Sequence, residues 1–368
     1  MSTVAAIAID SYRELNSKRL FWVSLAISAL VVLAFAAIGI NEKGITILWW
    51  EFESFINSNL VKPEVFYKGL FTGFGVGFWL AWLATILALV STAGIIPEFV
   101  SSGTIPLVLS KPIPRWRLFL LKYLGSLAFV ALQVTLFSLA SFLVLGFRGG
   151  VWEPMVFMAI PIVVVFYSYL YSICVLIGMI TKSTIAALLL TLLVWVGLFS
   201  VHAVESGLLS VRVVSDLTAE NINAEIERIE GRVEEGRVTP EAAEARIEVL
   251  ADERDEVLEK TRNWRYIHTG TMVLKTILPK TSETIALLER WMVEMADMPE
   301  GQQTGEQPSE LAQMFGSSSE FAPSDEAVQR ETIERTRERS VVWVIGTSLL
   351  FEIVVLGIAM WIFVRRDF

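Results

Sequence analysis

The residues best suited to chemistry lie between two long apolar segments, in the stretch Gly94–Gly125, GIIPEFVSSGTIPLVLSKPIPRWRLFLLKYLG. The stretch is rich in proline and glycine. It carries four basic residues and a single acid, namely Lys111, Arg115, Arg117, Lys122 and Glu98. These residue types suit charge-assisted contact with another protein rather than bond making. We interpret the stretch as a contact through which a second protein moves this chain, with a short helix, a turn and a basic return.

A second candidate is Glu352, an acid inside a long apolar run near the C-terminus. An acid at such a depth in a membrane is costly and usually faces protein or water. Two interpretations stay open. Glu352 is either a functional intramembrane group or a protonated structural residue that is bonded to a neighbouring helix.

The sequence lacks the motifs of a self-contained enzyme. It has no Walker A pattern for ATP phosphates, no G-x-S-x-G and no H-E-x-x-H. The two histidines, His202 and His268, have no cysteine or carboxylate cluster at ligand spacing, so a metal site is not expected. Cys174 is the lone cysteine, and the basic residues form no nucleic-acid footprint. We therefore expect no catalytic residues, no bound cofactor and no nucleic-acid partner.

The elements that position these residues are predicted to be membrane helices. Of the 368 residues, 54% are apolar, which is more than a soluble domain needs. Six apolar segments are long enough for a bilayer crossing, which takes about 20 residues. They lie near 20–40, 70–96, 118–147, 155–180, 183–204 and 341–364. The sequence predicts an all-α polytopic membrane protein with six transmembrane helices, of which the third is long enough to tilt or break.

The distribution of lysine and arginine predicts the orientation. With the N-terminus inside, ten of these residues fall in inner segments and four in short outer loops. We therefore expect both termini, and the loop 94–117, on the cytosolic side of a bacterial inner membrane. Residues 1–19 are expected to form an interfacial helix, with a frayed tail as the alternative. A signal peptide that ends at Ala36 is disfavoured because the preceding segment contains acids.

The second span carries a stripe of small residues, which recur every four positions as Gly69, Gly73, Gly77 and Ala81. In lipid, such a stripe lets two helix backbones approach closely. The stripe is predicted either to pack within the subunit or to line a subunit interface or a transport path.

Residues 205–340 differ in composition from the rest of the chain. They contain 16 Lys and Arg against 29 Asp and Glu, a net charge of −13, whereas the whole chain carries −9. Alternation of the spans places this acidic domain outside the cell. Residues 217–263 predict a helical hairpin, because an apolar stripe ends at Gly236 and Thr239-Pro240 is a typical helix start. The hairpin is either a solvated structure or a docking surface for an extracytoplasmic partner.

Three further segments complete the acidic domain. Residues 281–298 predict an amphipathic helix that lies on the membrane surface or caps the exit of a pathway. Residues 299–324 are rich in Gly, Gln, Ser, Pro and Glu and predict disorder. From about Asp325 a charged helix leads into the sixth span, and residues 341–368 form that span and the C-terminus.

The stretch 94–125 resembles the permease (transmembrane) subunits of type-2 ATP-binding-cassette (ABC-2) exporters. The resemblance rests on Glu98, Ser102-Gly103-Thr104, Leu107, Leu109, Ser110-Lys111-Pro112-Ile113, Arg115, Arg117 and Lys122-Tyr123-Leu124-Gly125. The ending Phe363–Asp367 and the plan of an interfacial helix plus six spans are also similar to that family. The large domain before the sixth span departs from the family, whose members often have only short helices there.

The resemblance implies a translocation unit of two permease chains, identical or related, to which two separate nucleotide-binding subunits dock from the cytosol. Those subunits would bind ATP and Mg. The implied coupling residues are Pro97, Glu98, Phe99, Ser102, Gly103 and Thr104, and the implied membrane re-entry residues are Lys111, Arg115, Arg117 and Lys122. The second and fifth spans would line the path, with Trp79, Trp82 and Trp195 as candidates for pathway residues or for packing.

Other functions stay open beside this one. The chain is alternatively a membrane-anchored scaffold or mechanotransmission subunit, whose acidic hairpin binds an envelope partner. A multi-span membrane enzyme is disfavoured because the sequence has no polar constellation that suits catalysis.

Overall fold

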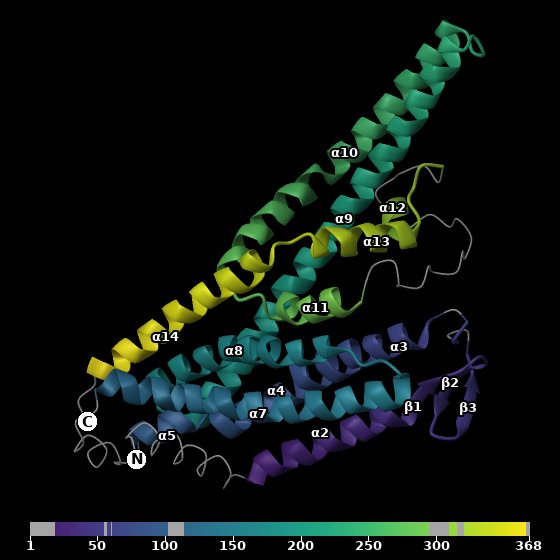
Figure 1. Ribbon diagram of the computed structural model, residues 1–368. Coiled ribbons are helices and arrows are strands. Elements are labelled where there is room, and N and C mark those ends of the chain that lie inside the picture. The colour runs from purple at the N-terminus through teal and green to yellow at the C-terminus, as the bar shows by residue number, and fades with distance from the viewer. Residues whose placement is uncertain are drawn as a thin grey trace. The chain divides into compact units, whose positions relative to one another are not determined.

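The computed structural model describes residues 19–54, 57–59, 61–101, 114–293, 309–314 and 320–365. The described chain forms two compact units. The first comprises residues within Met1–Phe199, Leu278–Pro299 and Val341–Phe368, and the second comprises residues within Ser200–Ile277 and Glu300–Ser340. Figure 1 labels the elements of both units. The interfacial helix predicted for residues 1–19 lies outside the described residues except for Arg19, which begins the first described helix.

The first unit is a bundle of apolar helices around α8. In chain order its helices are α2 (Arg19–Ala37), α3 (Pro63–Gly69), η1 (Leu70–Ala84), α4 (Thr85–Thr92), α5 (Ile95–Ser101), α7 (Arg115–Gly149), η2 (Pro154–Met158), α8 (Ala159–Thr181), the first part of α9 (Thr184–Glu234), α11 (Thr281–Met292), η4 (Val342–Gly346) and α14 (Thr347–Arg365). Helix α8 packs against α5, α7, α11 and α14. Its side chains from Phe166 to Leu170 are fully or almost fully buried, so α8 is the core helix of this unit.

Five helices of the described chain are long and apolar enough to cross a membrane. They are Pro63–Pro97, Arg115–Gly149, Pro154–Thr181, Thr184–Glu234 and Val342–Arg365, and a shorter apolar helix occupies Phe21–Ala37. The protein is therefore a helical, multi-pass membrane protein, and the count of six spans stays a prediction. The long third segment is one unbroken helix, α7, of 35 residues. At about 1.5 Å per residue it measures about 52 Å, which exceeds the ~30 Å hydrocarbon core.

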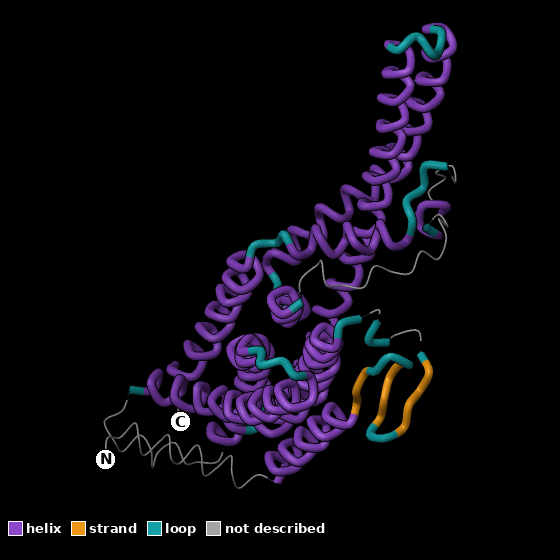
Figure 2. The backbone as a smooth tube through the Cα atoms, turned by 45° about the vertical axis from the view of Figure 1, so that its right-hand side comes forward, coloured by secondary structure: helices purple, strands orange, loops and turns teal. Residues whose placement is uncertain are grey.

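A small antiparallel sheet follows α2 and was not predicted from the sequence. Its strands are β1 (Ile38–Ile40), β2 (Gly44–Ile47) and β3 (Trp50–Glu53), in the order β1-β2-β3, drawn in orange in Figure 2. Ile38 pairs with Ile47, and Gly44 pairs with Glu53. β-branched isoleucines at alternate positions favour strands. The predicted first span, 20–40, included β1, whereas β2 and β3 lie beyond it.

The second unit is built on a long helical hairpin. The part of α9 from Ser200 to Glu234 pairs with α10 (Pro240–Ile277), beside the short helices α12 (Glu310–Met314) and α13 (Asp325–Arg337) (Figure 1). Gly236 has a φ of 68° in the connecting turn, a conformation that glycine adopts without strain. The hairpin is longer than the predicted range 217–263, because α9 continues without a break through residues 205–217 and α10 continues to Ile277.

The segment predicted to be disordered, 299–324, lies partly outside the described residues. Its described parts differ from that expectation. Phe321 is 6% exposed and joins a core with Ile222, Ile229 and Leu250 of the hairpin. Asn221 Nδ2 donates a hydrogen bond to the Phe321 carbonyl oxygen at 3.0 Å. Phe321 therefore anchors this part of the segment to the hairpin.

Helix α11 corresponds to the amphipathic helix predicted at 281–298. Leu287 and Leu288 are buried in the core of the first unit, and the helix packs against α8 and η1. Its apolar face is therefore covered by protein, and residues 294–298 lie outside the described part of the chain.

Candidate coupling site and buried polar clusters

Helix α5 is the described part of the predicted coupling stretch. Ile95 and Ile96 are buried, as is Pro97. A Cβ atom added to Gly178 of α8 would lie 2.7 Å from Pro97 Cγ, so the proline ring sits directly against the α8 backbone. Helix α5 contacts both α7 and α8. Its first turn is therefore anchored to two membrane helices.

Phe99 extends this anchor to α7. The Lys122 Nζ atom lies 5.7 Å from the centre of the Phe99 ring, a distance at which a cation is attracted to an aromatic face. Lys122 is itself 8% exposed. The predicted re-entry residue Lys122 thus also supports α5. Of the other predicted coupling residues, the Glu98 side chain and the whole of Ser102, Gly103 and Thr104 lie outside the described residues, as does Lys111.

Arg115 and Arg117 lie in the first turn of α7. Arg115 Nη1 donates a hydrogen bond to the Val364 carbonyl oxygen at 3.0 Å, near the end of α14. The Arg117 guanidinium lies 5.1 Å from the centre of the Trp116 ring. Tryptophan and arginine together are typical of a bilayer–water boundary. The start of α7 and the end of α14 therefore meet at one end of the bundle.

A chain of buried hydroxyl groups leads from α4 into the bundle. Thr92 Oγ1 and Tyr167 Oη lie 2.6 Å apart, and the Tyr167 ring stacks on Tyr171. Tyr171 Oη lies 2.8 Å from Ser126 Oγ, and its ring stacks on Tyr123. Thr92 ends α4 shortly before α5 begins. The segment that carries α5 is thereby connected to α7 and α8.

Glu352 lies at the end of this chain. Tyr123 Oη donates a hydrogen bond to Glu352 Oε1 and Ser168 Oγ donates one to Oε2, each at 2.8 Å. The side chain is 8% exposed. The acid thus joins α14 to α7 and α8, which is what its structural interpretation requires. The stacking of Tyr167 and Tyr171 could be anticipated from the sequence, because their spacing of four residues places them on one face of a helix.

The stripe of small residues divides into two parts. Gly69 and Gly73 are exposed, and a Cβ atom added to either would meet no described atom within 4 Å. Gly77 is close only to a backbone oxygen of its own helix, whereas Ala81 is 5% exposed. Packing within the described chain therefore covers the Ala81 end and leaves the glycine end open.

The candidate tryptophans take different roles. Trp79 is buried and its Nε1 donates to Ser28 Oγ at 3.1 Å, which joins η1 to α2. Trp82 stacks on Trp195 of α9, with ring centres 4.8 Å apart and planes 22° apart. Trp79 is thus a packing residue, while Trp82 and Trp195 bring the second and fifth predicted spans into contact.

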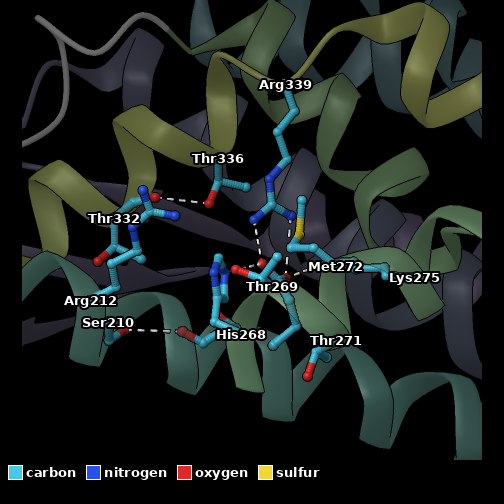
Figure 3. Close-up of polar contacts among 12 residues, drawn as sticks. Ser210, Arg212, His268, Thr269, Thr271, Met272, Lys275, Thr332, Thr336 and Arg339 are labelled. Atoms are coloured by element: carbon cyan, nitrogen blue, oxygen red, sulfur yellow. Dashed lines mark hydrogen bonds and ion pairs between the residues drawn. The ribbon is translucent and has the colours of Figure 1, made fainter. Parts of the chain in front are cut away.

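The second unit contains two ion clusters that sequence analysis did not predict, of which the first is buried and the second is partly exposed. In the first, Glu205 is 1% exposed and accepts hydrogen bonds from Arg339 Nη2, at 2.5 Å, and from Lys275 Nζ. His268 Nε2 lies 3.3 Å from Glu205 Oε1. Figure 3 shows the Arg339 side chain reaching toward the centre that His268 also approaches. Lys275 Nζ also lies 3.2 Å from His202 Nδ1, so an ammonium group already occupies the space between His202 and Glu205.

The second cluster surrounds Asp216. Arg335 Nη1 donates to Asp216 Oδ2 at 2.7 Å, Arg265 donates to Oδ1, and Arg212 Nε lies 3.8 Å away. The two clusters tie α9, α10 and the segment of α13 together. In the pairs that join two helices, the two residues lie 49 or more positions apart in the sequence. No local sequence motif could therefore predict these clusters. The visible signal was that Arg265, His268 and Lys275 lie among several large apolar residues of α10.

Burial shifts the titration of His268. Its removal from water lowers the pKa of His268 below the usual value, and the neighbouring Glu205 carboxylate opposes this effect without reversing it. Burial thus favours the neutral form of His268 in the first cluster, beside the carboxylate of Glu205.

Comparison with known proteins identifies the membrane part of the chain. The family model of the ABC-2 family transporter proteins matches residues 5–212, more than half of the chain, and this match includes the whole stretch 94–125. Neither the curated proteins nor the solved structures gave a match.

Proposed function

Because the chain belongs to the ABC-2 transporter family, we propose that it is the permease subunit of an ATP-driven exporter and works as a dimer. Separate nucleotide-binding subunits hydrolyse ATP and contact the chain through the loop 94–117. In this proposal the protein resides in a bacterial inner membrane, with both termini and α5 on the cytosolic side. Its own contribution is the path through the membrane.

The packing of α5 is the observation that carries this proposal. Pro97 lies against the α8 backbone, and Phe99 lies against Lys122 of α7. A force on α5 would therefore reach both membrane helices. Because close-packed interiors shift between discrete arrangements rather than deforming continuously, a displacement of α5 would move α7 and α8 as units. The hydroxyl chain from Thr92 to Glu352 would carry the same displacement to α14.

The test is purification of the full chain in mild detergent, followed by an ATPase assay. We expect the wild-type chain to recover a nucleotide-binding subunit with ATPase activity. Glu98→Arg is expected to weaken this recovery and to leave membrane insertion normal, because it reverses a charge on α5. Glu42→Arg is the matched control, since it reverses an exposed acid in the turn between β1 and β2.

Two outcomes would count against the proposal. If no ATPase accompanies the chain under conditions that preserve a membrane dimer, the exporter function is excluded. If Glu98→Arg and Glu42→Arg recover equal ATPase activity, α5 does not use Glu98 as a contact.

A mechanical role toward an extracytoplasmic partner is the second candidate function. It is favoured by α9, whose 51 residues form one helix from Thr184 to Glu234. Such a helix is about 76 Å long at ~1.5 Å per residue. In this role α9 would carry motion from the apolar segment to the hairpin. Capture of an envelope protein by a photo-cross-linker at residues 217–263, with its yield dependent on ATP, would support this role over transport alone.

A further inference from the structure

The buried face of helix α10 changes from apolar to polar residues partway along the helix. Toward the tip of the hairpin, its buried positions are the apolar residues Ala243, Leu250 and Val257, and its exposed positions are mostly charged. From there to its end, its buried positions are the polar residues Thr261, His268 and Lys275. The ionic contacts are thus turned inward in the second half of the helix.

The outward face of this second half is apolar. It carries six large side chains that are each 43–71% exposed, namely Trp264, Tyr266, Ile267, Val273, Leu274 and Ile277, and we call them with Gly270 the α10 stripe. A Cβ atom added to Gly270 would meet no described atom within 4 Å. Residues 263–277 contain two charged side chains, Arg265 and Lys275, and both are paired with acids of α9. The α10 stripe therefore presents a continuous surface without charge.

The first ion cluster locates the membrane boundary. Glu205 directly follows the apolar run that ends at Val204, and Arg339 precedes the apolar helix that begins at Val342. Because Lys275 contacts the same carboxylate, the end of α10 lies at this level. The rest of the α10 stripe extends from this boundary toward the tip of the hairpin.

The α10 stripe is longer than the headgroup layer is thick. From Trp264 to Ile277 the stripe is about 20 Å long, at ~1.5 Å per residue. The headgroup layer beyond the hydrocarbon is only about 5–8 Å thick on each side. A protein partner is therefore the occupant that could cover the stripe over its whole length.

The spacing of the stripe describes that partner. Ile267, Gly270, Leu274 and Ile277 follow the i, i+3, i+7, i+10 pattern of a two-stranded coiled-coil seam. Gly270 allows the two backbones to approach closely at its centre. The fitting partner is thus another apolar helix that runs alongside α10.

Charge restricts where two copies of the chain can make contact. Residues 205–340 carry a net charge of −13, so contact between two copies is repulsive over most of this domain. The α10 stripe has no charge, and two copies inserted in the same membrane align their α10 helices in parallel. We propose that the α10 stripe is the contact between two copies of this chain beyond the hydrocarbon layer. The inference rests on the dimer of the proposed function and adds the surface that forms it.

The experiment is cysteine cross-linking of the full chain in native membranes. The lone cysteine is buried and is replaced by Cys174→Ser. In a parallel seam each position meets its own copy, so Ile267→Cys and Leu274→Cys are expected to give a covalent dimer on oxidation with copper phenanthroline. Val249→Cys is the matched control. Val249 is similarly exposed, but it lies in the half of α10 toward the tip of the hairpin, where the exposed positions are mostly charged. It is expected to stay monomeric.

A second variant tests whether the seam is formed by the apolar side chains. Ile267→Glu is expected to abolish most of the Leu274→Cys cross-link, because it places two like charges opposite each other. Val249→Glu should leave the cross-link unchanged. Equal loss with both variants would overturn the assignment of the seam.

The remaining outcomes separate this inference from the proposed function. If an amine-reactive cross-linker shows a dimer but neither stripe cysteine forms a disulfide, the α10 contact is wrong and the dimer stands. If no dimer is detected by either method, both fail. A cross-linked product of another mass would identify a different protein on the stripe. A spin label at Leu274 with the oxygen accessibility of lipid would identify lipid as the occupant. Either result would overturn the second-copy assignment.

Discussion

Glu352 in the first unit and Glu205 in the second are both buried acids, yet their surroundings differ. The hydrogen-bond donors to Glu352 within the described residues are the hydroxyl groups of Tyr123 and Ser168. Glu205 instead meets the cations Lys275 and Arg339. A buried charge requires a partner of opposite charge and hydrogen bonds, whereas a buried polar group requires hydrogen bonds alone. The comparison shows that the membrane unit joins its helices by hydroxyl contacts and that the hairpin unit joins them by ion pairs.

The largest effect expected from this comparison is that of Glu205→Gln. The substitution leaves Lys275 and Arg339 buried without their shared counter-charge, and breaking a buried pair in this way costs about 3–5 kcal/mol. We expect the second unit to unfold at lower temperature and to become sensitive to protease. Glu259→Gln is the control, since the Glu259 side chain is 74% exposed. Equal stability of the two variants would show that the Glu205 cluster contributes little.

The effect at Glu352 is expected to be smaller and to depend on the substituent. Glu352→Leu removes the carboxylate that accepts from Tyr123 and Ser168, whose hydroxyls keep the backbone carbonyl oxygens of Ser168 and Val165 as acceptors. The expected cost is therefore that of the lost hydrogen bonds, about 0.5–1.5 kcal/mol each. Glu352→Gln retains an acceptor oxygen and should cost less, as measured by thermal unfolding in detergent. If Glu352→Gln leaves both transport and assembly intact, a functional role of the acid is excluded. Loss of transport with normal assembly would instead establish that role.

The smallest effect is the pH dependence from His268. Its pKa in the folded protein is lowered, chiefly by burial, so the neutral ring is favoured by folding. Its contribution is fully present above the unfolded pKa of about 6.5. It is lost as the pH falls through the lower folded pKa, because the unfolded chain takes up the proton first. Thermal unfolding between pH 7.5 and 5 should therefore show falling stability that His268→Gln reduces. An unchanged slope in that variant would assign the pH dependence to another group.

Much of the fold followed from hydrophobicity and helix signals. The apolar runs predicted the membrane helices, and Thr239-Pro240 predicted the start of α10, which begins at Pro240. The unbroken course of α9 was missed, because the change from apolar to polar residues near Glu205 was taken as the end of a helix. The polarity of its side chains indicates whether a helix is surrounded by lipid, protein or water. The helix itself commonly ends near residues such as glycine and proline. Residues 184–234 contain no proline, and α9 passes through Gly197, Gly207 and Gly231 without ending.

The candidate site was predictable to a different degree in its two parts. The apolar residues of α5 and the basic start of α7 were visible as a local motif. The partners of Glu352 and Glu205 were not, because Tyr123 and Lys275 lie 229 and 70 residues away from them in the chain. Such pairs are decided by how helices pack, and the sequence offered only the presence of polar residues in apolar surroundings as a sign that partners exist.

The continuous backbone of α9 fixes a ratio between the movements of its two ends. From Glu205 to Glu234 the helix extends about 44 Å, at ~1.5 Å per residue. A tilt of about 5° at the level of Glu205 would then carry the Glu234 end through about 4 Å, from the same rise per residue. This is about the separation of two side chains in contact. A small tilt of this part of α9 would thus suffice to make or break a contact at its Glu234 end, by virtue of its length alone.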